Sequence, residues 1–243
     1  MTVLHLADEG EAADLAAFLS RLLHYDRSAA VRLQAAGTAL AVFGRPPSFE
    51  VLAVRTVRLA KPYEHGLDAT LDVTVSAGEL LESVDERSAT ARVPGAVTGP
   101  PWAGVLPPRG GWRAEPGLPA PDALRALVAA AVAEFRARTE ELAAEDRTRA
   151  TLDGIGREIW SRTVCDTGLP VRAVHAAQSL GFLRPRGASG PEAGIATGSG
   201  SGSGSGEDAP RLFSSGAWLR LRTPFGSVAL RRAGTGALGI SVR

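Results

Sequence analysis

Apolar residues recur along this chain with two periods, and each period predicts one kind of element. Over residues 11–24 they follow helical spacing, so one stripe of the helix would face a core. Six other runs alternate apolar and polar residues, which is typical of half-buried strands. These runs span residues 2–7, 29–34, 38–44, 49–60, 67–75 and 89–93. The pattern predicts an α+β domain over residues 1–95, with an antiparallel sheet and one or two helices.

A capping signal at Ser76 indicates the second of these helices. Glu79 follows Ser76 by three residues, which is the spacing of a capping box, and Leu80 and Leu81 come next. We therefore expect a short helix directly after the strand over residues 67–75.

Helical periodicity returns in the middle of the chain. Three helices are predicted, over residues 122–145, 147–164 and 169–180. Pro170 suits the first turn of the third helix, and Gly181 suits the position just after its end. The sequence thus predicts a helical region over residues 121–185.

The C-terminal part of the chain returns to the strand pattern. Residues 217–223 and 226–232 alternate around a Pro-Phe turn, which predicts a β-hairpin. A last strand is expected over residues 237–243. Within the hairpin, one side would carry Leu219 and Leu221, and the other side would carry Trp218, Arg220 and Arg222.

The expected fold class is α+β, with an N-terminal antiparallel sheet and one or two helices, then a helical region and a C-terminal β-hairpin. A Gly/Ser-rich segment before the hairpin has the composition of a flexible insertion. The predicted parts are an α+β domain over residues 1–95, a Pro/Gly/Trp-rich ordered arm over 96–120, a three-helix region over 121–185, the flexible insertion over 186–209 and a basic β-hairpin over 210–243.

The segment over residues 96–120 combines many prolines and glycines with two of the four tryptophans. A flexible linker avoids tryptophan, because each buried aromatic side chain removes about 150–250 Å² of surface from water. We therefore expect an ordered arm that packs on a neighbouring domain through Trp102 and Trp112, with Arg109 between them. The alternative is that the two indoles line a groove for a ligand or a peptide.

Composition narrows the class of protein. The 27 basic residues include a single lysine, Lys61, an imbalance typical of GC-rich genomes such as those of actinobacteria. One cysteine, Cys165, allows no intramolecular disulfide. The N-terminus lacks the pattern of a signal peptide, and no apolar run approaches the about 20 residues that span a bilayer. We expect a soluble, cytoplasmic protein without a membrane partner.

The net charge of +1 is unevenly distributed, because residues 210–243 hold six arginines and no acidic residue. Three helices followed by a basic hairpin is the element order in the second half of a winged helix, a DNA-binding fold. Its reading helix would present Arg172, His175 and Gln178, which recur at every third residue. Its phosphate contacts would come from Arg220, Arg222, Arg231 and Arg232. The alternative is that the hairpin joins the N-terminal sheet or covers the helices, with its arginines in solvent.

Signals for catalysis, metal binding and cofactor binding are weak. The four histidines lack metal-ligand spacing, and the sequence contains no P-loop, dinucleotide fingerprint or nucleophile elbow. Cys165 is expected near the end of a helix, which is the wrong pole to stabilise a thiolate. We expect no catalytic residue, no metal and no cofactor.

Three functions are consistent with these patterns. The preferred one is a non-enzymatic cytoplasmic binding or scaffold protein, whose partner is another protein or a second copy of the chain. The second is a winged-helix-like DNA-binding protein. The third is an enzyme without a recognisable signature, with a pocket beside Trp102 and Trp112.

Overall fold

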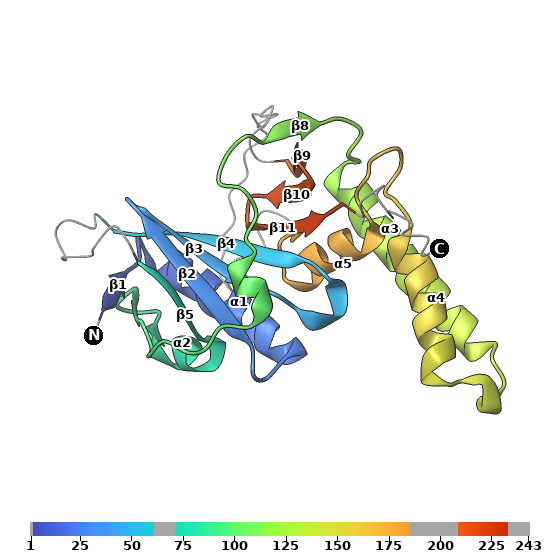
Figure 1. Cartoon of the computed structure of the whole chain (residues 1–243), viewed down its shortest axis with the longest axis horizontal. Helices are drawn as coiled ribbons and strands as arrows, with labels where there is room; N and C mark the ends of the chain where they lie inside the picture. The colour runs from blue at the N-terminus through green and yellow to red at the C-terminus, as the bar shows by residue number, and fades with distance from the viewer. Residues whose placement is uncertain (1, 61–70, 185–208, 233–243) are drawn as a thin grey trace, which may run out of the picture.

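The structure, a computed structural model, describes residues 2–60, 71–184 and 209–232. It is a mixed α+β fold, which confirms the expected fold class (Figure 1). Its described strands form one large antiparallel sheet and one small sheet. In spatial order the large sheet consists of β5 (Asp72–Ser76), β2 (Ala30–Ala36), β3 (Ala39–Gly44), β4 (Leu52–Arg58), β11 (Gly226–Arg231), β10 (Trp218–Thr223), β9 (Arg211–Ser215) and β8 (Arg113–Glu115).

The large sheet joins the two ends of the chain. β11 pairs with β4, with Val228 opposite Ala53. Of the two alternatives for the C-terminal hairpin, the structure has the one in which it joins the N-terminal sheet. The strands β9 and β8 then extend the sheet beyond the hairpin, and the sequence pattern predicts neither of them.

Alternation along the strands gives the large sheet two different faces. The inner face is apolar, and Leu219 and Leu221 of β10 are buried there as predicted. The outer face carries Trp218, Arg220 and Arg222, which alternate with them. Because directly paired residues share a face, the register assigns further residues to the inner face, namely Val31, Leu33, Val42, Ala53, Val228 and Leu212.

Two helices cover the N-terminal half of the inner face. α1 (Glu9–Tyr25) begins after Asp8, whose carboxylate accepts a hydrogen bond from the Glu11 amide at 2.8 Å. α2 (Ala77–Ser83) begins after Ser76, whose hydroxyl accepts from the Glu79 amide at 3.3 Å, and this confirms the predicted cap. The buried stripe of α1 includes Leu15, Phe18, Leu19 and Leu22.

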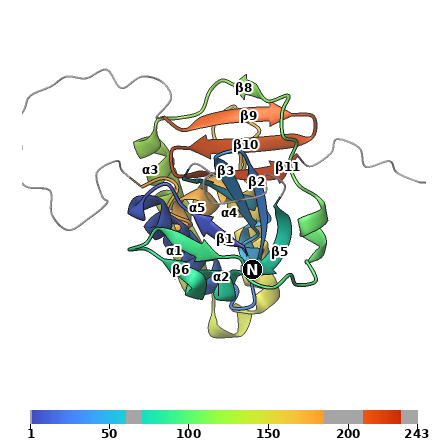
Figure 2. The ribbon, with the colours of Figure 1, turned by 90° about the vertical axis from the view of Figure 1, so that its left-hand side faces the viewer.

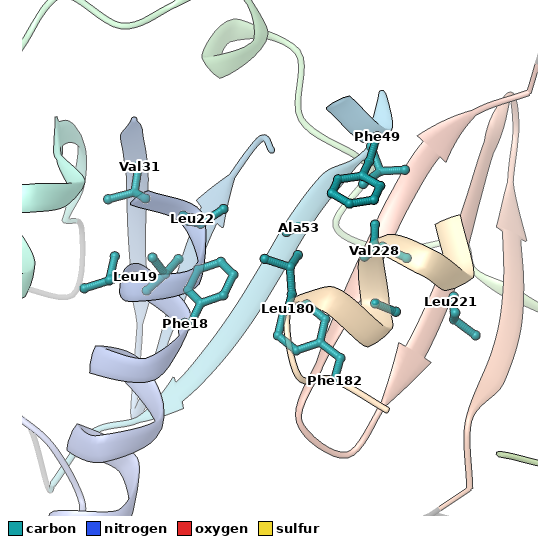
Figure 3. Close-up of a cluster of buried hydrophobic side chains, with 14 of the residues drawn as sticks. Phe18, Leu19, Leu22, Val31, Phe49, Ala53, Leu180, Phe182, Leu221 and Val228 are labelled. Atoms are coloured by element: carbon teal, nitrogen blue, oxygen red, sulfur yellow. The ribbon is translucent and has the colours of Figure 1, made fainter. Parts of the chain in front are cut away.

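The helix α5 (Val171–Ser179) covers the C-terminal half of the inner face. It ends at Ser179, and Gly181 follows with a positive φ of 76°, which suits the predicted role after a helix end. Phe182 then stacks on Phe18 of α1, with ring centroids 5.7 Å apart. Figure 3 shows these side chains gathered around Ala53 of β4, together with Leu221 and Val228. The N-terminal and C-terminal strands therefore share one core.

The small sheet lies beside α2. It consists of β1 (Val3–His5), β7 (Thr90–Arg92) and β6 (Val84–Asp85), in that order. Two of the predicted strands, over residues 2–7 and 89–93, thus pair with each other. The first of them also bridges to the end of β4, because the Ala7 amide donates to the Arg58 carbonyl at 2.9 Å.

Two longer helices project from the rest of the molecule (Figure 1). α3 (Pro121–Glu140) and α4 (Arg149–Ser161) are connected through a short 3-10 helix, η4 (Ala144–Asp146). Arg162 contacts Glu134 at 2.6 Å and Glu158 at 2.9 Å, and Arg138 contacts Glu158 at 2.8 Å. Hydrogen bonds from Arg138 and Arg162 lower the pKa of Glu158 to about 2. An exposed ion-pair network thus links the two helices.

One buried guanidinium connects β4 with two other elements. The side chain of Arg55 is 8% exposed, and its Nη2 lies 3.0 Å from Asp14 and 3.3 Å from Glu11, both on α1. Its Nη1 donates to the carbonyl of Phe225, in the turn between β10 and β11, at 2.7 Å. Arg55 therefore holds α1 and the C-terminal hairpin against the same strand.

Some predictions fall outside the described residues. These are the strand over 237–243, the beginning of the strand over 67–75 and nearly all of the insertion over 186–209. The division of the chain into five parts stays a prediction.

Replacing Arg55 by alanine should lower the free energy of unfolding by about 2 kcal/mol, because Asp14, Glu11 and the Phe225 carbonyl lose a buried charged donor. Arg58→Ala is the matched control. Arg58 also contacts Glu11, at 2.8 Å, but its side chain is 68% exposed, so we expect little change. Chemical denaturation followed by circular dichroism measures both variants. Equal losses in the two variants would contradict this role of Arg55.

The ionised carboxylate of Glu158 should stabilise the fold down to low pH. Its folded-state pKa of about 2 lies below the ordinary 4.5, so the stabilisation is complete above pH 4.5 and is lost as the pH falls toward 2. Carboxyl NMR titration should give a midpoint near 2 in the wild type. In Arg162→Ala the midpoint should rise toward 4.5. A wild-type midpoint near 4.5 would show that the two arginines do not hold Glu158.

Candidate ligand-binding groove

The arm over residues 96–120 crosses the outer face of the large sheet (Figures 1 and 2). It begins beside β5, where the Val97 amide donates to the Thr74 carbonyl at 2.9 Å. It continues through a short 3-10 helix, η3 (Pro101–Gly104), and then adds β8 next to β9. The arm therefore reaches from one edge of the sheet to the other.

Trp102 anchors the first half of the arm. Trp102 and the arm residue Leu106 both pack against a buried apolar cluster on the outer face. Arg32 of β2 donates to the Ala103 carbonyl and holds η3 in place. The cluster on β3 and β4 consists of Phe43, Leu52 and Val54, with Ala41 at its margin.

Trp112 anchors the second half. Its indole Nε1 donates to the Pro108 carbonyl at 3.0 Å, which closes a turn around the exposed Arg109. The guanidinium of Arg220 lies over the Trp112 ring, 5.7 Å from its centroid. Ser215 of β9 donates to the Gly110 carbonyl at 3.3 Å. Both indoles thus contact the sheet or its side chains.

A groove of about 600 Å³ lies between the two anchors, under the arm. Its floor is largely apolar, and its roof is the segment 106–109. Asp72 of β5 and Arg220 of β10 flank the floor on opposite sides, because their strands lie on either side of β2, β3 and β4. The floor residues include Gln34, Ala41, Phe43, Val54 and Thr56.

The acidic side of the groove is already neutralised. Arg32 contacts Asp72 at 2.8 Å, and Gln34 donates to Asp72 at 3.0 Å. The hydrogen bond from Arg32 is the main cause that lowers the pKa of Asp72, and the positive charge of Arg109 adds to it. Asp72 therefore stays ionised and paired.

The basic side of the groove is not neutralised. Arg220 donates through Nε to the Ser227 hydroxyl at 2.9 Å, and no carboxylate among the described residues pairs with it. Burial is the main cause that lowers the pKa of Arg220, and the neighbouring charge of Arg222 lowers it further. A half-buried cation thus faces the groove without an anionic partner in the described parts of the chain.

The residues of the proposed reading helix lie on the other side of the sheet. His175 of α5 packs between Trp160 and Phe49, with ring centroids 4.7 Å and 5.1 Å away, and burial lowers its pKa. Arg172 lies 3.4 Å from the Glu50 carboxylate. Gln178 is exposed. Because α5 covers the inner face, these residues do not share a surface with Arg220.

The hairpin arginines divide between the two faces. Arg222 and Arg231 are exposed on the outer face, as their pairing with Ser227 and Trp218 requires. Arg232 instead contacts Glu115 of β8 at 3.2 Å.

Sequence reasoning missed the floor of the groove. Phe43 and Val54 stand next to Val42 and Ala53, which face the core, so both strands are apolar on two faces. Such continuous apolar runs indicate a strand that is covered on both sides. This signal could have placed the arm over β3 and β4.

The described residues give little support for other site chemistry. No cluster of three or more metal-ligating side chains occurs in them. Cys165 is exposed. Among the described helices, none combines the length and apolarity needed to cross a membrane.

Two family models match the chain, and both are described as domains of unknown function. DUF8010 matches residues 1–104, and DUF8185 matches residues 107–235, which is more than half of the chain. No curated protein and no solved structure matches it. The boundary between the two matched regions falls within the arm. The groove therefore takes its floor from the first region, and Arg109 and Arg220 from the second.

Trp102→Ala should release the first half of the arm and lower the free energy of unfolding by about 2 kcal/mol, because a half-buried indole leaves the outer face. Val105→Ala is the control, since Val105 lies in the same arm but is 51% exposed. Hydrogen exchange followed by mass spectrometry should show faster exchange over residues 98–108 in Trp102→Ala. Unchanged exchange there would mean that Trp102 is not the anchor.

Proposed function

We propose that this chain, which belongs to the DUF8185 family, is a non-enzymatic binding protein of the cytoplasm that holds an acidic segment of a partner protein in the groove under its arm. The observation that carries the proposal is Arg220, a half-buried guanidinium that no described carboxylate neutralises. An anion from a partner would complete the site.

The chemistry of Arg220 favours a carboxylate as the anion. A guanidinium presents a planar fork of donors that fits two carboxylate oxygens. Arg220 uses its Nε for Ser227, and its two terminal nitrogens make no hydrogen bond to described residues. Arg109, in the roof, adds a second positive charge beside the same groove.

The floor favours a peptide over a bare ion. Ala36, Ala39 and Ala41 offer accessible apolar surface in the same groove as Arg220, so a segment with neighbouring acidic and apolar side chains would satisfy both. The volume of about 600 Å³ lies within the range of ordinary ligand pockets, about 300–1,000 Å³, and holds a few side chains.

The state of Asp72 supports binding over catalysis. Asp72 is the carboxylate among the described residues that line the groove, and its pKa is lowered by Arg32. A general base or acid works best when its pKa lies near the working pH, so a carboxylate held by an arginine is poorly suited to proton transfer.

The test uses wild type, Arg220→Ala and Arg222→Ala as parallel baits in a lysate of the source cells. Arg222 is the matched control, because it lies on the same strand and face but does not line the groove. We expect a partner that the wild type and Arg222→Ala recover and Arg220→Ala loses. An acidic peptide from that partner should bind Arg220→Ala about tenfold more weakly than wild type, since charged hydrogen bonds are lost.

Circular dichroism of each bait shows whether the variant is folded. The proposal fails if the folded Arg220→Ala bait recovers the same proteins as the wild type, or if the wild type recovers none.

A further inference from the structure

The outer face of β9, β10 and β11 alternates arginines with aromatic residues. We refer to it as the arginine–aromatic face. Strand pairing places Arg211 opposite Arg222, Phe213 opposite Arg220, and Trp218 opposite Arg231, so all six side chains lie on one side of the sheet. Its described members are Arg211, Phe213, Trp218, Arg220, Arg222 and Arg231.

The pairing of Arg211 with Arg222 is unfavourable by itself. Like charges directly opposite each other on adjacent strands destabilise a sheet. Both side chains are exposed, and no carboxylate among the described residues pairs with either of them. Arg222 also repels the positive charge of Arg220, and this repulsion helps to lower the pKa of Arg220. Sequences usually avoid such contacts unless a partner compensates them.

The aromatic residues add flat surfaces on which a ligand ring could stack. Arg231 lies over the Trp218 ring, 5.9 Å from its centroid, and Arg211 lies over the Phe213 ring at 5.5 Å. Trp218 and Phe213 are half-buried, so neither residue is fully covered by the rest of the protein. Flat rings and guanidinium planes both accept a stacked nucleobase.

We infer that the arginine–aromatic face binds single-stranded nucleic acid. Phosphates would contact Arg211, Arg222 and Arg231, and bases would stack on Trp218 and Phe213. The partner supplies the negative charges that the Arg211–Arg222 pair lacks. This mode needs neither α5 nor a winged-helix arrangement, because every residue lies on the outer face of one sheet.

A single strand fits this surface better than a duplex or an acidic protein. The outer face offers Trp218 and Phe213 as partly accessible stacking surfaces, and a duplex keeps its bases stacked inside. An acidic peptide would use the arginines but would not need the exposed rings. The inference is independent of the proposed function, because the residues assigned to phosphates and bases do not line the groove. Arg220 lies on both surfaces, and the nucleic-acid inference assigns it no contact.

The test measures anisotropy of a fluorescein-labelled oligothymidylate of about 12 nucleotides, a length within the usual site size of single-strand binders. The full chain should bind it with micromolar affinity at low salt, and more weakly as salt rises. In the double variant Arg211→Ala/Arg222→Ala, the slope of log K against log salt should become shallower by about 1.4, because two phosphate contacts are lost. Trp218→Ala should bind about tenfold more weakly at every salt concentration.

Two controls separate this surface from general charge and from folding. Arg136→Ala/Arg149→Ala removes the same charge from exposed positions on α3 and α4, and should bind like the wild type. The Arg211/Arg222 variant loses facing like charges, so its thermal midpoint should be at least that of the wild type. Its weaker binding would then reflect a lost contact and not lost structure.

Three results would overturn the inference. The first is no binding at low salt. The second is equal binding by wild type and Trp218→Ala, which would mean that no base stacks there. The third is displacement of the oligonucleotide by polyglutamate as effectively as by unlabelled oligothymidylate at equal charge, which would indicate a surface for acidic proteins.

Discussion

A buried positive charge on β4 is the constraint on which the rest of the structure depends. Arg55 faces the inner side of the large sheet, where an isolated charge would be strongly unfavourable. Asp14 and Glu11 on α1 and the Phe225 carbonyl in the hairpin turn compensate it. These partners come from opposite ends of the chain, so they meet only when β11 has paired with β4. That pairing makes the outer face continuous, and the groove requires the continuity because its floor lies on β3 and β4 while Arg220 lies on β10.

Short sequence patterns predict those helices and turns that are stabilised mainly by residues close together in sequence. The stripe of α1, the cap at Ser76 and the alternation of the C-terminal hairpin each depend on residues that are close together in sequence. The choice of neighbouring strands is different, because many antiparallel pairings satisfy the same alternation. The pairing of β11 with β4 is accompanied by contacts from Arg55 to α1 and to the turn, which are distant in sequence. β8 is three residues long and too short to show a pattern.

The sequence predicted the arm of the candidate site but not the floor, because only the arm has a distinctive local composition. Two indoles in a Pro/Gly-rich segment indicated that the arm is ordered, and they identified Trp102, Trp112 and Arg109. The floor was not visible, because a periodicity of two says which residues share a face but not what covers it. The same limit applies to α5. Its threefold spacing correctly places Arg172 and His175 on one side, but the packing of His175 between Phe49 and Trp160 comes from other elements.

The distance in sequence between β4 and β11 also delays their pairing during synthesis of the chain. The turn at Phe225 comes 170 positions after Arg55, and a ribosome that adds about 5–20 residues per second needs about 10–30 s to reach it. Until then β4 is an open edge with apolar side chains on both sides, the kind of strand that recruits other chains. The arm emerges much earlier. Once Trp102 has settled on Phe43 and Val54, one side of the waiting strand is shielded. The first half of the arm is therefore expected to cover one apolar face of β4 before its last partner strand has been made.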